Sequence, residues 1–293
     1  LIIAVTAVSC IAFLLIPHAA FLGGAAPAAS LALILAWAAT SSALRAPPWV
    51  LLSKYAAVPS LPWMNALALS GMAIGGALAP YLGVALRNVD PTLPFAVSSL
   101  TLFAVTAGLV WVERALARRP TMGRQSMPKL GELLPGMSLF LTACLALALG
   151  FQIHTALNSA PQYLRFAAPD QLEYLLPVFW IGFNVAMFPG AALARRFGTL
   201  PVIAMAAALG AGGAAVSVHA QNIDILIAAQ LLAGGAWGCI MMAGFSAALA
   251  FGRTGREGTA LGLLFGMLAV ATFSRMGVVA AQLNKTPDYA ALL

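Results

Sequence analysis

Charged residues are scarce in this chain of 293 residues. Asp, Glu, Lys and Arg together make up only 8% of it, whereas 62% of the residues are hydrophobic. Soluble domains average about 25% charged and about 45–50% apolar residues. A water-soluble domain of this length could not hide so much apolar surface. The composition excludes a soluble enzyme, a nucleic-acid-binding domain and a disordered chain, and it predicts an integral membrane protein.

Acidic residues are the scarcest charged class, with eight Asp and Glu against 15 Lys and Arg, for a net charge of +7. The basic residues lie in short gaps between apolar runs, so we expect them to follow the positive-inside rule and not to bind nucleic acid. All the acids lie in expected loops or at helix ends: Asp90, Glu113, Glu132, Asp170, Glu173, Asp224, Glu257 and Asp288. No acid is expected at mid-membrane, but a helix outside this sequence could carry one, so a proton remains the candidate coupling ion.

Cysteine and histidine are also rare, with three of each. The cysteines lie inside apolar runs without metal-ligand spacing, and we expect them to be packing residues: Cys10, Cys144 and Cys239. The histidines stand on different expected helices with no acid beside them: His18, His154 and His219. An intramembrane hydrolase needs paired catalytic groups within the spans. We therefore expect no enzyme, no metal site and no cofactor.

Apolar runs long enough to cross a bilayer dominate what is present. A bilayer core of about 30 Å needs roughly 20 helical residues. Nine runs approach that length: 1–17, 30–52, 62–86, 93–112, 133–157, 172–193, 200–219, 224–250 and 258–281. The breaks carry Gly, Pro, Asn and Asp, and the alternation typical of strands is absent. The sequence predicts an all-α polytopic helical bundle of about nine transmembrane helices in a lipid bilayer.

The cations distinguish the two ends of these helices. Strict alternation of the spans places ten of them on one side: Lys54, Arg114, Arg118, Arg119, Arg124, Lys129, Arg195, Arg196, Arg253 and Arg256. The other side receives three: Arg87, Arg165 and Lys285. We expect the first side to face the cytoplasm. The longest basic gap, 113–132, is predicted to be a cytoplasmic linker between an N-terminal half of four spans (1–112) and a C-terminal half of five (133–293).

Two short motifs in the chain resemble known transporter signatures. The gap after the sixth run is similar to a transporter loop signature, G-x-L-a-D-r-x-G-r-k, through Leu193, Ala194, Arg196 and Gly198. It departs from that signature at three positions: Ala191 for the first Gly, Arg195 for the Asp and Thr199 for a basic residue. The third run is similar to an antiporter signature, G-x-x-x-G-P-x-x-G-G, through Gly75, Pro80 and Gly83, with Ala79 and Val84 replacing two glycines.

These motifs resemble those of the major facilitator superfamily, whose members have two pseudo-symmetric six-helix halves. Both motifs stand two helices earlier here than in the family, so the chain resembles helices 3–11, and we expect it to be a fragment. The resemblance implies a monomeric secondary transporter of the inner (plasma) membrane. Such a protein moves a small organic solute by alternating access. The antiporter signature favours efflux.

The resemblance also implies which spans line the cavity: 30–52, 133–157 and 224–250. Trp37, Ser41 and Arg45 follow each other at helical spacing in the first of them. An arginine inside a span indicates function by default. Alternatively, Arg45 snorkels to the cytoplasmic interface near Lys54.

The span 133–157 has a high density of polar residues near its end: Gln152, His154, Thr155, Asn158, Ser159 and Gln162, around Pro161. These groups either bind a polar substrate or mark the emergence of the helix into the outer interface. His154 alone is typical of an interhelical hydrogen bond as well as of a proton carrier.

The span 224–250 offers Gln230, Gly234, Trp237 and Met241 on one stripe, and its glycines are expected to be packing sites. Trp237 opposite Trp37 would form an aromatic pocket, or both are packing residues. Asn184 is a further cavity candidate.

Two other functions stay open. With Arg45 and Arg275 as anion anchors, the chain would take up a small anionic metabolite. Alternatively, it is a non-transporting sensor on a transporter fold.

Overall fold

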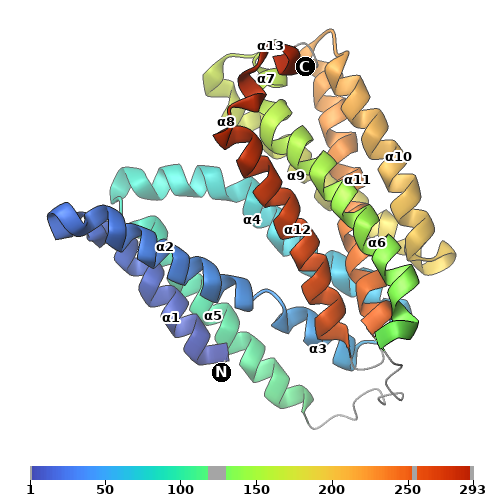
Figure 1. Ribbon diagram of the computed structural model, residues 1–293, viewed down its shortest axis with the longest axis horizontal. Coiled ribbons are helices and arrows are strands. Elements are labelled where there is room, and N and C mark those ends of the chain that lie inside the picture. Colours follow the sequence, from blue (N-terminus) through green and yellow to red (C-terminus); the bar gives the residue numbers. More distant parts are fainter. Residues whose placement is uncertain (1, 118–129, 253–255, 291–293) are drawn as a thin grey trace. The chain divides into compact units, whose positions relative to one another are not determined.

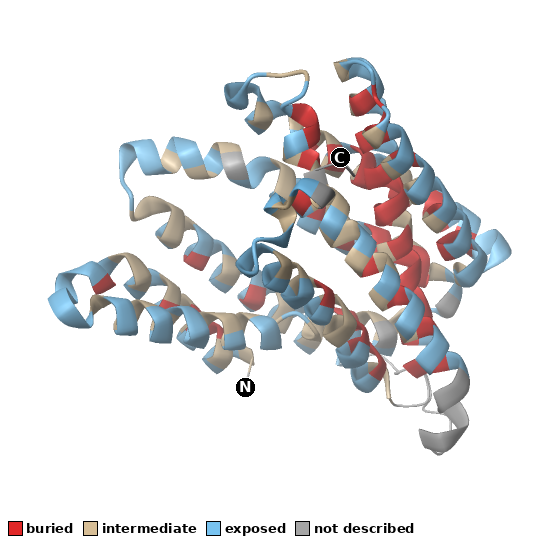
Figure 2. Ribbon diagram, turned by 45° about the horizontal axis from the view of Figure 1, so that its top comes forward, coloured by how far each residue is buried: buried red, intermediate tan, exposed pale blue. Residues whose placement is uncertain are grey.

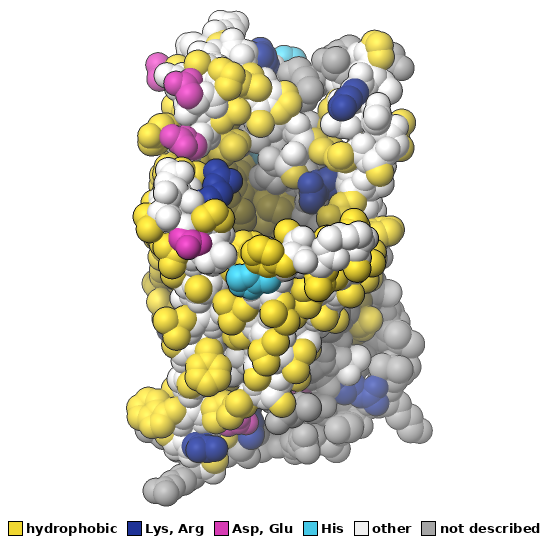
Figure 3. Space-filling view, turned by 90° about the vertical axis from the view of Figure 1, so that its left-hand side faces the viewer, with side chains coloured by type: hydrophobic (Ala, Val, Ile, Leu, Met, Phe, Trp, Pro, Cys, Tyr) yellow, Lys and Arg dark blue, Asp and Glu magenta, His cyan; other side chains and the backbone are white. Residues whose placement is uncertain are grey.

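The computed structural model describes residues 2–117, 130–252 and 256–290, and it is all-helical in these ranges (Figure 1). Eight stretches are long and apolar enough to cross a membrane: Ile2–Leu52, Leu61–Ala79, Leu93–Leu116, Gly136–Tyr163, Pro169–Phe197, Thr199–Val218, Ile223–Gly252 and Glu257–Ala280. Hydrophobic side chains are spread over the described surface seen in Figure 3, as expected for a surface in contact with lipid. The chain is a polytopic, all-helical membrane protein.

The count of eight differs from the predicted nine because the first two predicted spans fall in one stretch of 51 residues, Ile2–Leu52. This stretch contains α1 (Ile2–Leu15), a 3-10 helix (Ile16–Ala25), α2 (Ala26–Ala43) and α3 (Pro47–Tyr55). Gly23, at φ 56°, lies in the turn from which α2 returns along α1 (Figure 1). Left-handed backbone of this kind favours glycine.

The predicted continuous helix from 30 to 52 is wrong. Helix α2 ends at Ala43, and Arg45 lies exposed in the turn before α3. Pro47 and Pro48 have no N–H to continue the hydrogen-bond ladder, and a residue before proline avoids helical backbone. Arg45 therefore does not share a helical face with Trp37 and Ser41.

The described chain divides into two compact units. The first comprises Leu1–Tyr55 and Ala79–Met122 and includes α5 (Leu93–Leu116) and the end of α4 (Leu61–Val89). Within it, Thr6 on α1 donates a hydrogen bond to Thr106 on α5 over 3.2 Å, and both are buried. In the turn before α5, the hydroxyl and the backbone N–H of Thr92 both donate hydrogen bonds to Asp90 Oδ1. These bonds lower the pKa of the Asp90 carboxyl.

The second unit comprises Ala56–Leu78 and Gly123–Leu293. Its long elements are α6 (Leu130–Phe151), a π-helix (Gln152–Asn158), α9 (Pro177–Phe197), α10 (Thr199–Val218), α11 (Ile223–Gly252) and α12 (Glu257–Ala280). Short helices complete it: α7 (Ser159–Tyr163), α8 (Leu172–Leu175) and α13 (Pro287–Ala290). Helix α11 packs along α9, α10 and α12 and holds more buried residues than any other described helix (Figure 2).

Glycines set the approach of α9 to α11. A Cβ at Gly234 would lie 1.9 Å from the Phe179 carbonyl oxygen, and one at Gly238 would lie 2.5 Å from that of Phe183. A Cβ at Gly182 on α9 would lie 2.1 Å from the Leu231 carbonyl oxygen. Small residues let membrane helices touch backbone to backbone. The predicted packing role of the α11 glycines is confirmed.

The described cations of the second unit lie at or near the ends of its helices. Alternation of its helices puts Arg195, Arg196 and Arg256 at the end where α9 and α11 finish, and Arg165 and Lys285 at the other. The predicted cytoplasmic orientation of the first of these ends stays a prediction. Several cations of the predicted cytoplasmic side lie outside the described residues: Arg118, Arg119, Arg124, Lys129 and Arg253. The same holds for most of the predicted linker 113–132, so the division into two halves there stays a prediction.

Gly198 alone connects α9 to α10, at φ 92° and ψ 164°. This backbone region is essentially restricted to glycine, and other residues there cost on the order of 1–3 kcal/mol. We expect Gly198→Ala to lower the free energy of unfolding, measured by SDS titration of the purified protein, by about 2 kcal/mol. Gly212→Ala in α10 is the control, because a Cβ there meets no described atom within 4 Å. Equal stability of the two variants would contradict a strained turn.

Candidate functional site

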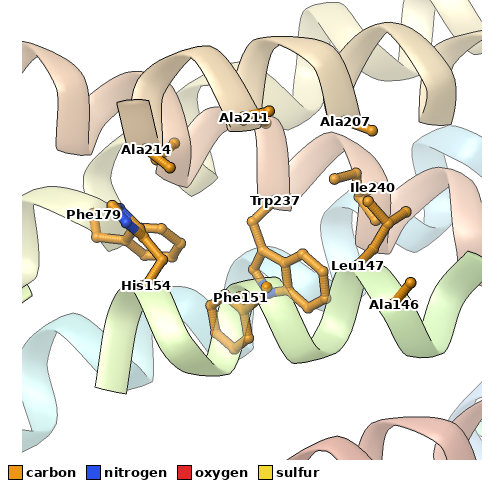
Figure 4. Close-up of a pocket in the computed structure, with 14 residues that line it drawn as sticks. Ala146, Leu147, Phe151, His154, Phe179, Ala207, Ala211, Ala214, Trp237 and Ile240 are labelled. Carbon is orange, nitrogen blue, oxygen red and sulfur yellow. The ribbon is translucent and has the colours of Figure 1, made fainter. Parts of the chain in front are cut away.

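A cavity of about 200 Å³ lies between α6, α10 and α11 (Figure 4). The π-helix contributes His154 to its lining. Four α-helices contribute the rest: Ala146, Leu147, Gly150 and Phe151 on α6; Phe179 on α9; Ala207, Gly210, Ala211 and Ala214 on α10; and Ala233, Ala236, Trp237 and Ile240 on α11. Among the described residues that form this lining, none is an Asp, Glu, Lys or Arg. The cavity therefore suits an uncharged ligand.

Residue size explains why space remains here. Alanine and glycine face the cavity from α10, and they leave room that longer side chains would fill. On the other side, Phe151 and Trp237 stack with ring centroids 4.2 Å apart and planes at 7°. Figure 4 shows Trp237 and Phe151 side by side, with His154 nearer to Phe179. The result is an aromatic wall facing a smooth wall of small residues.

At the polar end of the cavity, His154 belongs to a chain of three hydrogen-bonded side chains. His154 Nε2 lies 3.2 Å from Gln230 Oε1, and Gln230 Nε2 donates to Gln162 Oε1 over 3.4 Å. Gln162 and Gln230 are fully buried. Of the three, only His154 lines the cavity. The two amides hold the imidazole ring at the cavity surface.

The π-helix that carries His154 has a local cause. The hydroxyl of Thr155 donates to the Phe151 carbonyl over 2.7 Å, and Pro161 brings no N–H to the ladder at the start of the next turn. Of the two, the missing N–H of Pro161 interrupts regular α-helical bonding just after the π-helix. Single π-turns of this kind are frequent at functional sites.

The structure brings three predicted cavity residues together: His154, Gln230 and Trp237. The others of the second unit have different partners. Gln152 donates to Thr272 on α12 over 3.0 Å, and Asn184 donates to the Trp180 carbonyl of its own helix over 3.0 Å. Neither lines the cavity, and their predicted binding role stays a prediction.

The predicted cavity residues of the first unit have partners within that unit. Trp37 stacks on Phe13 with centroids 5.0 Å apart, and Ser41 donates to the carbonyl of Ala38. The aromatic pocket formed by Trp37 and Trp237 stays a prediction, because the two belong to different units.

The motif residues occupy two helices. Gly75, Pro80 and Gly83 lie within the uninterrupted α4, and a Cβ at either glycine would meet no described atom within 4 Å. In the last turn of α9, Leu193 and Arg196 are exposed, and the Arg196 guanidinium lies 5.2 Å from the centroid of Phe197.

Sequence reasoning missed the wall of α10 and two aromatic residues, Phe151 and Phe179. The alanines of α10 carry no chemical signal, and nothing in the pattern distinguishes those that face a cavity from those that face lipid. It also missed a buried pair: Asn65 on α4 donates to Ser246 on α11 over 2.7 Å. Asparagine in an apolar helix is itself the signal that could have found this pair.

Within the described ranges, no group of three His, Cys, Asp or Glu side chains could hold a metal ion. The comparisons with known proteins identify no relative: no family model, curated protein or solved structure matches the chain. The class that the structure defines is therefore a polytopic all-helical membrane protein with a small uncharged cavity in its second unit.

Proposed function

We propose that the chain is a secondary transporter that exports a small, uncharged, amphipathic organic solute by alternating access. The observation that carries the proposal is the cavity between α6, α10 and α11, which lies within the candidate membrane-spanning stretches. Two described lining residues, His154 and Trp237, carry a polar side-chain atom, and the rest of the lining is apolar. Ligand sites in helical membrane proteins are built in this way, with a few polar groups that orient the ligand.

The size of the cavity agrees with a small ligand. An apolar cavity of about 150 Å³ is large enough to bind benzene, and this one measures about 200 Å³. One or two fused rings fit the cavity as it stands, whereas a larger solute such as chloramphenicol requires the helices to move apart. Rocking of two halves about a site would provide that movement.

The motif resemblance supports the finer assignment to the major facilitator superfamily, with two pseudo-symmetric halves, a monomeric state and an inner-membrane location. The order of the two motifs, both two helices early, and the cations at alternate helix ends favour this assignment. The antiporter signature favours export over uptake.

Accumulation of radiolabelled chloramphenicol, a neutral aromatic compound, in bacteria that lack their own efflux pumps tests the proposal. Energised cells that express the protein should retain less of the compound than cells that express Ala211→Leu, because the added side chain fills the cavity. Ala208→Leu is the matched control: residue 208 is on the same helix, is exposed and does not line the cavity. It should transport normally.

Equal accumulation in all three strains, at equal membrane levels of protein, would contradict export and favour a non-transporting sensor. Uptake of radiolabelled benzoate would instead support the anion alternative. One observation favours that alternative: Arg275 in α12 has a buried Nε without a hydrogen-bond partner in the described part of the chain. Benzoate uptake should then fall in both Arg45→Gln and Arg275→Gln.

A further inference from the structure

We propose that the cavity selects uncharged aromatic compounds that carry one hydrogen-bond donor, such as an indole N–H or a phenol O–H, and that Nδ1 of His154 accepts this hydrogen bond. The inference deepens the proposed transport function and rests on it for its biological meaning. It makes His154 the specificity-determining residue of the cavity.

The hydrogen-bond chain behind the cavity assigns the role of each nitrogen of His154. Gln230 uses its Nε2 to donate to Gln162, so its Oε1 is left facing the histidine as an acceptor. An oxygen acceptor requires a donor opposite it, and neutral imidazole carries one N–H and one lone pair. Nε2 therefore holds the proton, and Nδ1 is left as an acceptor.

Nδ1 is the only side of the imidazole left for a ligand. Among the described residues it has no hydrogen-bond partner, while the ring itself lines the cavity. Gln162 and Gln230 are fully buried and anchor the ring from α7 and α11, so the ring is held in one orientation. A fixed acceptor at an apolar surface is a selective feature, because a ligand without a donor leaves it unpaired.

The remaining lining favours a flat ring over a flexible chain. Phe151, Phe179 and Trp237 supply aromatic surface on one side, and the alanines of α10 supply a smooth wall on the other. Aromatic rings gain from offset or edge contacts with such a wall. A bicyclic ring whose N–H or O–H reaches His154 satisfies both parts of the cavity.

Binding of indole and benzofuran to the full chain in lipid nanodiscs tests this inference. The two ligands have the same ring size, but benzofuran replaces the N–H by an oxygen and has no donor. A net hydrogen bond corresponds to roughly a 2- to 10-fold difference in affinity. Titration calorimetry should therefore show indole binding about 2- to 10-fold more tightly. Nanodiscs that carry Ala211→Leu supply the background of partitioning into lipid.

His154→Phe keeps an aromatic side chain and removes the acceptor, so the preference for indole should fall to about 1-fold. Elution of the variant as a single species in gel filtration checks that it is folded. Equal binding of the two ligands by the wild-type protein overturns the inference without any variant, and so does a preference that survives in His154→Phe or the absence of binding. Selective binding without export of either compound or of chloramphenicol would uphold the site and contradict the proposed transport.

Discussion

Gly234→Ala is expected to lower the free energy of unfolding by about 3 kcal/mol, the upper part of the range for an added methyl group in a close-packed interior. The new Cβ would lie 1.9 Å from the Phe179 carbonyl oxygen and 3.1 Å from its Cα. Both are backbone atoms, so no side-chain rotation relieves the overlap, and α9 must move as a whole. SDS titration of the purified protein, followed by circular dichroism, measures the effect.

The same substitution should also weaken ligand binding. Phe179, whose backbone touches Gly234, lines the cavity with its side chain. Displacement of α9 therefore moves one aromatic wall. Indole affinity measured in nanodiscs should fall in Gly234→Ala even under conditions where the variant remains folded.

Gly266→Ala in α12 is the matched control for this prediction. A Cβ at Gly266 would meet no described atom within 4 Å, and alanine is favoured over glycine within a helix by about 0.5–1 kcal/mol. We therefore expect the control to be neutral or slightly stabilised. Similar losses in both variants would show that α9 and α11 are not in backbone contact.

Hydrophobicity alone predicted most of the helices, because the bilayer sets a length that an apolar run must meet. The packing of α11 could also be predicted from its glycines, since Gly234 and Gly238 are four residues apart and share a face. Both features depend on one helix or one stripe at a time, and single-sequence reasoning handles such local patterns well.

Two departures from regular helix, the break at Arg45 and the π-helix, could not be predicted from hydropathy because different local signals oppose each other there. Arg45 was expected inside a helix because the run 30–52 is apolar, but Pro47 and Pro48 end α2 at Ala43. The π-helix Gln152–Asn158 lies just before Pro161, which has no backbone N–H. In both places hydropathy favours a continuous helix and the backbone chemistry opposes it.

The cavity could not be predicted from the sequence, because predicting it requires knowing which helices are neighbours. His154, Gln230 and Trp237 could be singled out as polar or aromatic residues in apolar spans. Their partners Phe151 and Phe179 could not, because phenylalanine is ordinary in a membrane helix. Selecting them requires the position of α6 beside α11, which follows from the packing of the whole unit.

Trp237→Ala is expected to destabilise the protein by about 2–3 kcal/mol, less than the 3–5 kcal/mol typical of Trp or Phe to Ala in soluble cores. The indole is 7% exposed and stacks on Phe151. Lipid tails are as apolar as the interior, so removing the ring costs packing contacts and little hydrophobic free energy. SDS titration again measures the loss.

Trp237→Phe separates stacking from size. A phenyl ring keeps the stack with Phe151 but fills less of the cavity wall, so the variant should recover more than half of the stability lost in Trp237→Ala. Trp111→Ala is the control, because this side chain on α5 is 72% exposed and its removal should cost less than about 0.5 kcal/mol. If Trp111→Ala lowered the free energy of unfolding as much as Trp237→Ala does, the loss would be a general effect of removing a tryptophan from a membrane helix. Only a loss specific to residue 237 supports its place in the aromatic wall that faces the ligand.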